Sequence, residues 1–360
     1  MRFVRKLWLP LFVGLVCALL LVEGLLAFLV SKPHVTRNLP PVFLSIAQTV
    51  YQFSRPVSVY LYGRHDAKLG YRYNEGSFDY STSEFQTTLA YNSQGLRSSE
   101  EPLRAPEIIF VGDSVTMGTG VEGNETFAHL VTKELGWRGL NAGVGSFGTP
   151  REMELLRQLD TSALRWIVLQ HHGNDAPENR AFYRANGNLS VMSEDTFAKL
   201  QEEELSKRNF GLLKHIRAFI HGHLEARRRR LGREVALEEQ TSAFLFALEG
   251  ATSHLPKEVR LLLIDTDGYG VYSPVFGNLV AEKARSGNYP PWIESLTFVD
   301  LSEVMGPEDG FVLDSHPNAR GHAKIAQEIV KAIRASELKE TGGRDAKSPP
   351  PFSAITQPEP

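Results

Sequence analysis

Five short apolar runs, separated by amphipathic helical patterns, limit the fold of this chain more than any other feature of its sequence. The runs cover residues 108–111, 139–143, 166–169, 261–264 and 297–301. Short apolar runs bounded by turn residues are typical of buried strands. Helical patterns with one apolar face cover residues 124–135, residues from 149 onward and residues 319–336. Buried strands that alternate with amphipathic helices predict an α/β fold with a five-stranded parallel sheet, covered by helices on both faces.

A charged insertion at about residues 176–256 separates the third strand from the fourth. Phe210, Leu213, Ile216 and Ile220 recur there at helical spacing, and an arginine run covers residues 227–230. One interpretation is that solvated helices cover the sheet. The other is a lid or a membrane-surface contact, with the arginines near phospholipid headgroups.

The N-terminus carries an apolar run at residues 7–30, after a basic segment at residues 1–6. About 20 apolar residues cross a bilayer as a helix, and Glu23 is the only charge in the run. A cleavable signal peptide is the alternative, but its apolar region is about 7–15 residues long and ends at a small-residue site. We therefore predict an uncleaved transmembrane signal anchor. Its basic N-terminal flank predicts a cytoplasmic N-terminus and a periplasmic or extracellular catalytic domain.

The remaining boundaries follow from changes in composition. Residues 31–100 are predicted to be a stalk and a small β-rich extension, which either packs against the core or forms a substrate-facing wall. The main domain covers residues 101–338, and the Pro-, Gly- and Ser-containing tail at residues 339–360 is predicted to be disordered. A net charge of −3 gives no reason to expect a nucleic-acid partner. Cys17 is the only cysteine, so an intrachain disulfide is impossible.

Polar and flexible residues follow the strands at the edge where parallel α/β sheets bind ligands. Ser114 follows the first strand, Gly143 the second and Asn174 the third. Asp314 and His316 follow the fifth strand after a loop. We expect these five residues to meet at the carboxyl edge of the sheet.

This set of residues suits acyl transfer. A serine hydroxyl needs a base to become a nucleophile, and His316 titrates near neutrality and can accept the proton from Ser114. Asp314 can orient the imidazole. The backbone N–H groups of Ser114 and Gly143 and the side-chain amide of Asn174 can donate to the oxyanion. No regular spacing of metal ligands is present, so we predict neither a metal nor a cofactor.

The same residues resemble the SGNH hydrolase family, also called GDSL esterases and lipases. The matching blocks are Gly112-Asp113-Ser114, Gly143, Gly173-Asn174-Asp175 and His316-Pro317-Asn318. They span residues 107–335. The resemblance implies a flavodoxin-like three-layer α/β/α sandwich and ester hydrolysis without a metal. The segment at residues 92–97 and the N-terminal anchor are similar to a membrane-tethered bacterial branch of that family.

Two blocks depart from the commonest family pattern. The acid often stands three residues before the histidine, where this chain has Leu313, and its carboxylate is Asp314, two residues before. If Asp314 does not reach His316, a dyad helped by a backbone carbonyl is the alternative. The third block often reads Gly-x-Asn-Asp, but here Gly173 directly precedes Asn174.

These observations predict a membrane-anchored serine esterase that acts on carboxylic esters, including acetyl esters, carried by glycans or lipids. One alternative is an O-acyltransferase that uses the same site to modify a cell-surface glycan. Another is a catalytically silent scaffold protein with the SGNH fold.

Overall fold

A five-stranded parallel sheet forms the centre of the molecule. The computed structural model describes residues 2–209, 211–231, 237–251, 255–266 and 272–340. The strands are β5 (Ile108–Val111), β6 (Gly139–Asn141), β7 (Trp166–His172), β8 (Arg260–Thr266) and β9 (Thr297–Val299). Their spatial order is β6-β5-β7-β8-β9, and all neighbouring pairs are parallel. This is the flavodoxin-like order, so the predicted fold class is confirmed.

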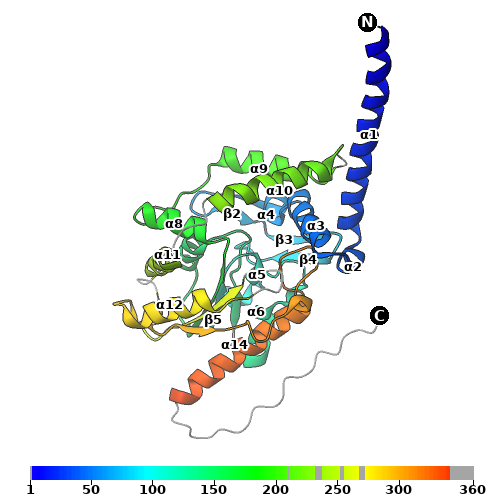
Figure 1. The fold of residues 1–360 in the computed structure, drawn as a ribbon. Helices are drawn as coiled ribbons and strands as arrows, with labels where there is room; N and C mark the ends of the chain where they lie inside the picture. The colour runs from blue at the N-terminus through cyan, green and yellow to red at the C-terminus, as the bar shows by residue number, and fades with distance from the viewer. Residues whose placement is uncertain (1, 210, 232–236, 252–254, 267–271, 341–360) are drawn as a thin grey trace.

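Helices cover both faces of the sheet because successive strand residues point to opposite sides. Ile109 and Leu261 pack with one group of helices and Ile108 and Leu262 with another. The first group includes α7 (Thr149–Leu156), α11 (Leu237–Glu249) and α12 (Val275–Ser286). The second consists of α6 (Phe127–Leu135) and α14 (Ala319–Glu340). The result is the three-layer arrangement visible in Figure 1.

The N-terminal helix α1 (Arg2–Ser31) contains the predicted anchor at residues 7–30. Its segment Trp8–Ser31 is long and apolar enough to cross a membrane, and a signal sequence has the same two properties. Leu26 and Leu29 near its end are buried against the body of the protein. The earlier part of α1 projects away from the body (Figure 1).

Residues 31–100, predicted as a stalk and a β-rich extension, fold onto the α/β domain. Their helices are α2 (Pro33–Thr36), α3 (Pro41–Ser54) and α4 (Ser58–Tyr62). Two antiparallel hairpins follow, β1 (Gly63–Asp66) with β2 (Gly70–Tyr73) and β3 (Gly76–Ser81) with β4 (Gln86–Tyr91). Tyr71, Tyr73 and Leu89 are buried in the same core as Ile109. Of the two interpretations of the β-rich extension, packing against the core therefore describes the hairpins.

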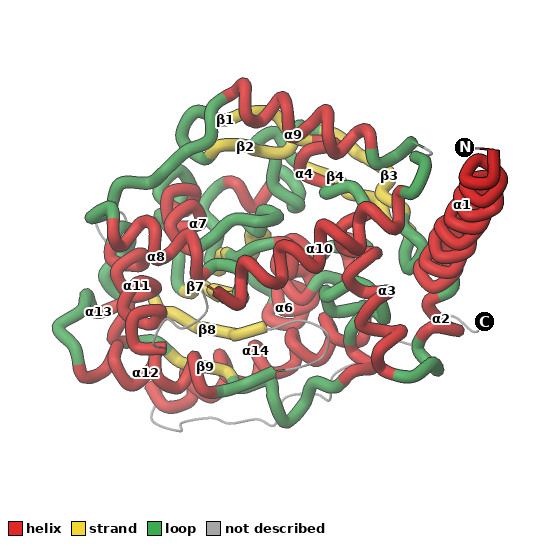
Figure 2. Tube along the Cα trace, turned by 45° about the horizontal axis from the view of Figure 1, so that its top comes forward, coloured by secondary structure: helices red, strands yellow, loops and turns green. Residues whose placement is uncertain are grey.

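The helices of the charged insertion pack in two different places. The helix α8 (Ala176–Arg184) packs against α7 and α11. The helix α9 (Glu194–Ser206) packs against α4 and β1, and α10 (Lys214–Leu231) packs against α1 and α3. In Figures 1 and 2, α10 lies between α9 and α3. Phe210, the side chains of residues 228–230 and residues 341–360 of the predicted tail lie outside the described part of the chain.

Candidate active site

Ser114 stands at the first position of the short helix α5 (Ser114–Met117), directly after β5. Gly112 makes the tight turn between the strand and the helix. Its φ is 155°, and a Cβ atom there would overlap the hydroxyl of Thr116. The carboxylate of Asp113 accepts a hydrogen bond of 2.9 Å from the backbone N–H of Val115. The turn thus holds Ser114 at the carboxyl edge of the sheet.

A hydrogen-bonded series links Ser114, His316 and Asp314. The distance between Ser114 Oγ and His316 Nε2 is 2.6 Å. On the other side of the ring, Nδ1 of His316 bonds to Oδ1 of Asp314. Because a carboxylate only accepts hydrogen bonds, Nδ1 carries the proton and Nε2 is free to accept from the serine hydroxyl. The backbone N–H of His316 also donates to Asp314 Oδ1, at 3.1 Å, which shows how the two-residue spacing reaches the ring.

Arg55 holds the second oxygen of Asp314. Arg55 Nε lies 3.3 Å from Asp314 Oδ2, and the side chain of Asp314 is fully buried. Burial alone would raise the pKa of Asp314, but the Arg55 guanidinium and His316 outweigh it and hold that pKa well below its usual range. Arg55 is itself held by the hydroxyl of Tyr80, at 2.9 Å from Nη1. Asp314 is therefore a carboxylate throughout the physiological pH range.

Glu84 anchors the backbone of the loop that carries Asp314. Its carboxylate accepts hydrogen bonds from the N–H groups of Val312, Leu313 and Asp314, at 3.0, 2.6 and 2.7 Å. Burial raises the pKa of Glu84, and the three N–H donors offset part of that increase. The side chain of Gln48 adds a hydrogen bond of 2.9 Å to the carbonyl oxygen of Val312. Helix α3 and the β3–β4 hairpin thus position the loop that carries Asp314 and His316.

Asn174 lies beside Ser114 on the loop that follows β7. Its side-chain Nδ2 donates to Asp113 Oδ2 at 3.2 Å, and the residue lines the same cavity as Ser114 and His316. Asp175 orders this loop by accepting a hydrogen bond of 3.0 Å from the backbone N–H of His172. One amide hydrogen of Asn174 is thus used by Asp113, and the second is available for a ligand.

Gly143 does not lie in the cavity, contrary to the sequence-based expectation. Its N–H donates to the side chain of Asn141 at 3.0 Å, the local turn that asparagine favours. A Cβ atom at Gly143 would overlap the backbone nitrogen of Met117, so the glycine allows the loop to pack behind α5. Its conformational role is to permit close backbone packing.

The same loop reaches the cavity two and three residues later, at Gly145 and Ser146. Ser146 has a φ of 62°, and the carbonyl of Gly145 accepts a hydrogen bond of 3.0 Å from the hydroxyl of Tyr71. In the described part of the chain, the N–H groups of Gly145 and Ser146 have no acceptor. These two N–H groups are therefore the candidates for oxyanion donors from this loop.

The cavity above Ser114 has a volume of about 500 Å³. Phe53 from α3 and His221 from α10 line it, together with Glu204 and Lys207 at the end of α9. Glu204 accepts hydrogen bonds from Lys207 Nζ at 2.6 Å and from the backbone N–H of Val57 at 2.9 Å. The N-terminal segment and the charged insertion therefore contribute to the wall of the site, which the sequence did not reveal.

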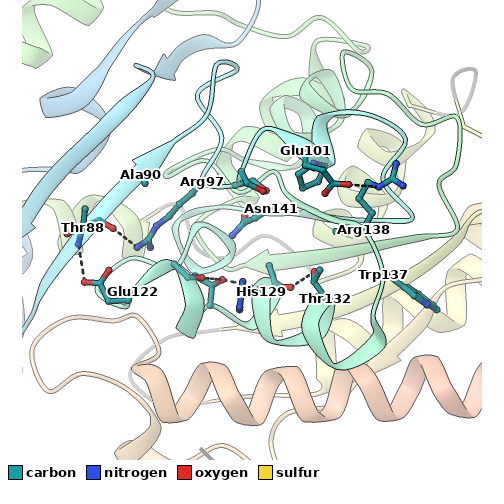
Figure 3. A pocket seen from close by; sticks show the side chains of 17 residues that line it. Thr88, Ala90, Arg97, Glu101, Glu122, His129, Thr132, Trp137, Arg138 and Asn141 are labelled. Carbon is teal, nitrogen blue, oxygen red and sulfur yellow. Dashed lines mark hydrogen bonds and ion pairs between the residues drawn. The ribbon is translucent and has the colours of Figure 1, made fainter. Parts of the chain in front are cut away.

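A larger cavity, of about 640 Å³, lies between the β3–β4 hairpin and α6 (Figure 3). Its charged groups pair with each other or with the backbone. Arg138 Nε lies 2.9 Å from Glu101 Oε1, and Arg97 Nη2 donates to the carbonyl of Thr88 at 3.0 Å. None of the five predicted site residues lines it. In the described ranges, no group of three or more His, Cys, Asp or Glu side chains is arranged to hold a metal ion.

A scan against protein-family models and a search of curated proteins found no significant match. Among solved structures, the chain is similar to a carbohydrate esterase family 2 (CE2) enzyme plus carbohydrate binding domain from Corynascus thermopiles (Myceliophthora fergusii). The identity is 17%, the TM-score is 0.37, and the alignment covers 64% of this chain and 66% of that chain. The functional assignment therefore rests on the geometry of the site.

Proposed function

We propose that this protein is a membrane-anchored serine esterase of the SGNH type that hydrolyses carboxylic esters, including acetyl esters. The observation that carries the proposal is the distance of 2.6 Å between Ser114 Oγ and His316 Nε2, with Asp314 on the opposite ring nitrogen. A nucleophile, a base within hydrogen-bond reach and a group that orients the base are the requirements for nucleophilic catalysis by serine.

In the acylation step, Ser114 Oγ attacks the ester carbonyl carbon and its proton passes to His316 Nε2. The imidazolium is stabilised by the carboxylate of Asp314. The negative charge on the former carbonyl oxygen is stabilised by the backbone N–H of Ser114 and the side-chain amide of Asn174, with an N–H from Gly145 or Ser146. His316 then returns the proton to the departing alkoxide, which leaves an acyl group on Ser114.

In the deacylation step, water takes the place of the alcohol. His316 Nε2 removes a proton from the water, and the resulting oxygen attacks the acyl carbon. Collapse of the second tetrahedral intermediate breaks the bond to Ser114 Oγ, which recovers its proton from His316. The products are a carboxylic acid and the restored enzyme.

The lining of the cavity supports an ester with a small acyl group on a polar alcohol. A volume of about 500 Å³ is within the range of small-molecule sites. Ser58, Thr119, His172 and Glu178 contribute polar atoms to its wall. The free part of α1 supports a membrane anchor, and the basic segment at residues 1–6 supports a catalytic domain in the periplasm or outside the cell.

Labelling with a fluorophosphonate and hydrolysis of p-nitrophenyl acetate test the proposal. We expect the wild-type protein to be labelled and active, and Ser114→Ala to fold normally without either property. Ser77→Ala, which removes an exposed hydroxyl on β3, is the matched control and should behave like the wild type. Equal labelling of the wild type and Ser114→Ala would refute the assignment. Analysis of products with a glycan acceptor present separates hydrolysis from acyl transfer.

A further inference from the structure

One side of α10 and the turn before it expose apolar and basic side chains together. Leu212 is 70% exposed, and Ile220 and Leu224 are each 52% exposed. Arg217 and Arg227 are exposed on the same helix. Positions 217, 220, 224 and 227 recur at intervals of three and four residues, so they share one face of α10. We call these five residues the α10 outer surface.

The opposite face of α10 is already used by the fold. Ala218 is buried with Val50 of α3 and Leu26 of α1. Gly222 lies so close to α3 that a Cβ atom there would overlap the side chain of Thr49. The α10 outer surface therefore points away from the body of the protein.

Glu23 of the apolar helix α1 fixes the beginning of α10. Its carboxylate accepts hydrogen bonds from the backbone N–H groups of His215 and Ile216, at 3.1 and 3.0 Å. It also lies 2.9 Å from Nδ1 of the His215 ring. A carboxylate at a helix N-terminus is favourable because the first N–H groups have no partner within the helix. The single charge in the apolar run thus joins α1 to α10.

The length of the apolar part of α1 is consistent with a junction near a membrane boundary. Residues 7–22, which lie between the basic segment and Glu23, are about 24 Å long at about 1.5 Å per residue, somewhat less than the hydrocarbon core of about 30 Å. If this part crosses the bilayer, Glu23 and the start of α10 lie at its surface. Figure 1 shows the free part of α1 projecting beyond the side of the body that carries α9 and α10.

We propose that the α10 outer surface rests on the headgroup layer of the same bilayer that α1 crosses. Leu212, Ile220 and Leu224 enter the boundary between headgroups and acyl chains, as the apolar face of an interfacial helix does. Arg217 and Arg227 lie among the phosphates of anionic lipids, which attract basic side chains. The occupant of this surface is thus the membrane itself.

Docking in this way places the catalytic cavity directly beneath the membrane surface. His221, one residue after Ile220, lines that cavity, and its ring packs edge-on against Phe53 of α3. Together with the proposed function, on which this step rests, docking assigns the substrate to polar esters carried by molecules at the membrane surface. The docking itself can be measured without any assay of activity.

Quenching of a fluorescent label by nitroxide lipids tests the docking on the full chain. The protein is reconstituted into phosphatidylcholine vesicles that contain phosphatidylglycerol. Cysteine is introduced as Leu212→Cys or as Ile220→Cys in a Cys17→Ser background, and it is labelled with nitrobenzoxadiazole. Lys331→Cys on α14 in the same background is the matched control, because Lys331 is 76% exposed and its helix lies on the far side of the body. Melting curves verify that each variant folds.

Native Cys17, which is exposed on α1, reports separately on the anchor. We expect its label to lose fluorescence to nitroxides deep in the bilayer. Labels at 212 and 220 should lose fluorescence to nitroxides near the headgroups and shift their emission to the blue, whereas the label at 331 should do neither. Quenching at 212 and 220 should also weaken when Arg217→Glu and Arg227→Glu are added.

Two outcomes would overturn the inference in distinguishable ways. If the Cys17 label is quenched but the labels at 212 and 220 behave like the one at 331, then α1 crosses the membrane and the α10 outer surface does not dock. If the Cys17 label is not quenched, α1 does not cross the bilayer, and the anchor in the proposed function fails with the docking. Neither outcome bears on the esterase chemistry of Ser114.

Discussion

Arg55 and Asp314 form an ion pair of 3.3 Å that joins the membrane-proximal part of the chain to the carboxylate behind His316. Arg55 follows α3, which packs against both α1 and α10. The same aspartate is linked through its backbone to Glu84. Residues before position 100 therefore complete the charge arrangement of the proposed catalytic site.

Arg55→Met should destabilise the protein and reduce its activity. Breaking a buried ion pair by removing one partner costs about 3–5 kcal/mol, and we expect the lower end because 17% of the Arg55 side chain is exposed. Arg55→Lys keeps the positive charge and should recover part of both losses. Urea unfolding and kcat on p-nitrophenyl acetate measure the two effects. Full activity in Arg55→Met would show that Asp314 does not need this partner.

Glu84→Gln should loosen the loop that carries Asp314. The amide has one oxygen instead of two to accept from the three N–H groups, and its own NH₂ group faces donors. Hydrogen bonds to charged groups contribute about 1.5–3 kcal/mol each, so kcat should fall and the amides of residues 312–314 should exchange hydrogen faster. Glu75→Gln, at an exposed position of the same region, is the control. Unchanged exchange at residues 312–314 would argue against an anchoring role.

Asn174→Ala and Gly143→Ala should fail in different ways. Asn174 is exposed in the cavity, so its removal should lower kcat by about 10²–10³-fold, as loss of an oxyanion donor does, with little change in Tm. Gly143→Ala places a Cβ atom on the backbone of Met117 and should destabilise the fold by about 1–3 kcal/mol. Thermal melting and kinetics on both variants make the comparison. A stable Gly143→Ala variant with a large loss of kcat would return Gly143 to the oxyanion site.

We expect the free energy of unfolding to fall in mild acid because of the buried His322. Burial, with smaller effects from the charges of Arg97 and His316, lowers the pKa of His322 to about 3. Its Nδ1 accepts a hydrogen bond from the backbone N–H of Phe127 at 3.2 Å. The unfolded chain binds a proton at this histidine below about pH 6.5, and the folded chain does so only near pH 3, so stability falls as the pH drops through this range.

At pH 5 the expected loss from His322 is about 2 kcal/mol relative to pH 7. His322→Asn keeps an acceptor near the Nδ1 position but cannot become charged, so its stability should depend less on pH. Urea unfolding of both proteins at pH 7 and pH 5 measures the difference. Parallel pH profiles would mean that His322 is protonated in the folded protein as easily as in the unfolded chain.

Local pattern was sufficient to locate the strands and the principal catalytic candidates. The central strands are continuous apolar runs because parallel strands in a three-layer fold are buried on both faces. The strands β5, β7 and β8 begin within one residue of the predicted positions. Because parallel strands end at one edge, the amino-acid sequence alone was enough to predict that Ser114, Asn174 and His316, which follow such strands, would meet.

The tertiary structure alone decided what surrounds those residues. No periodic or local sequence pattern marks Arg55 and Glu84 as part of the site. A charged side chain pairs with whatever group the fold brings near it, and the partners of these two residues lie more than 200 positions away in the sequence. The loop after β6 reaches the cavity at Gly145 and Ser146, whereas the N–H of Gly143 is bonded to Asn141. Hydrophobic periodicity shows which face of a helix is buried, but it does not show which element packs against that face. Only the fold shows that α9, α10 and α3 line the site and that Glu23 joins α10 to the apolar helix.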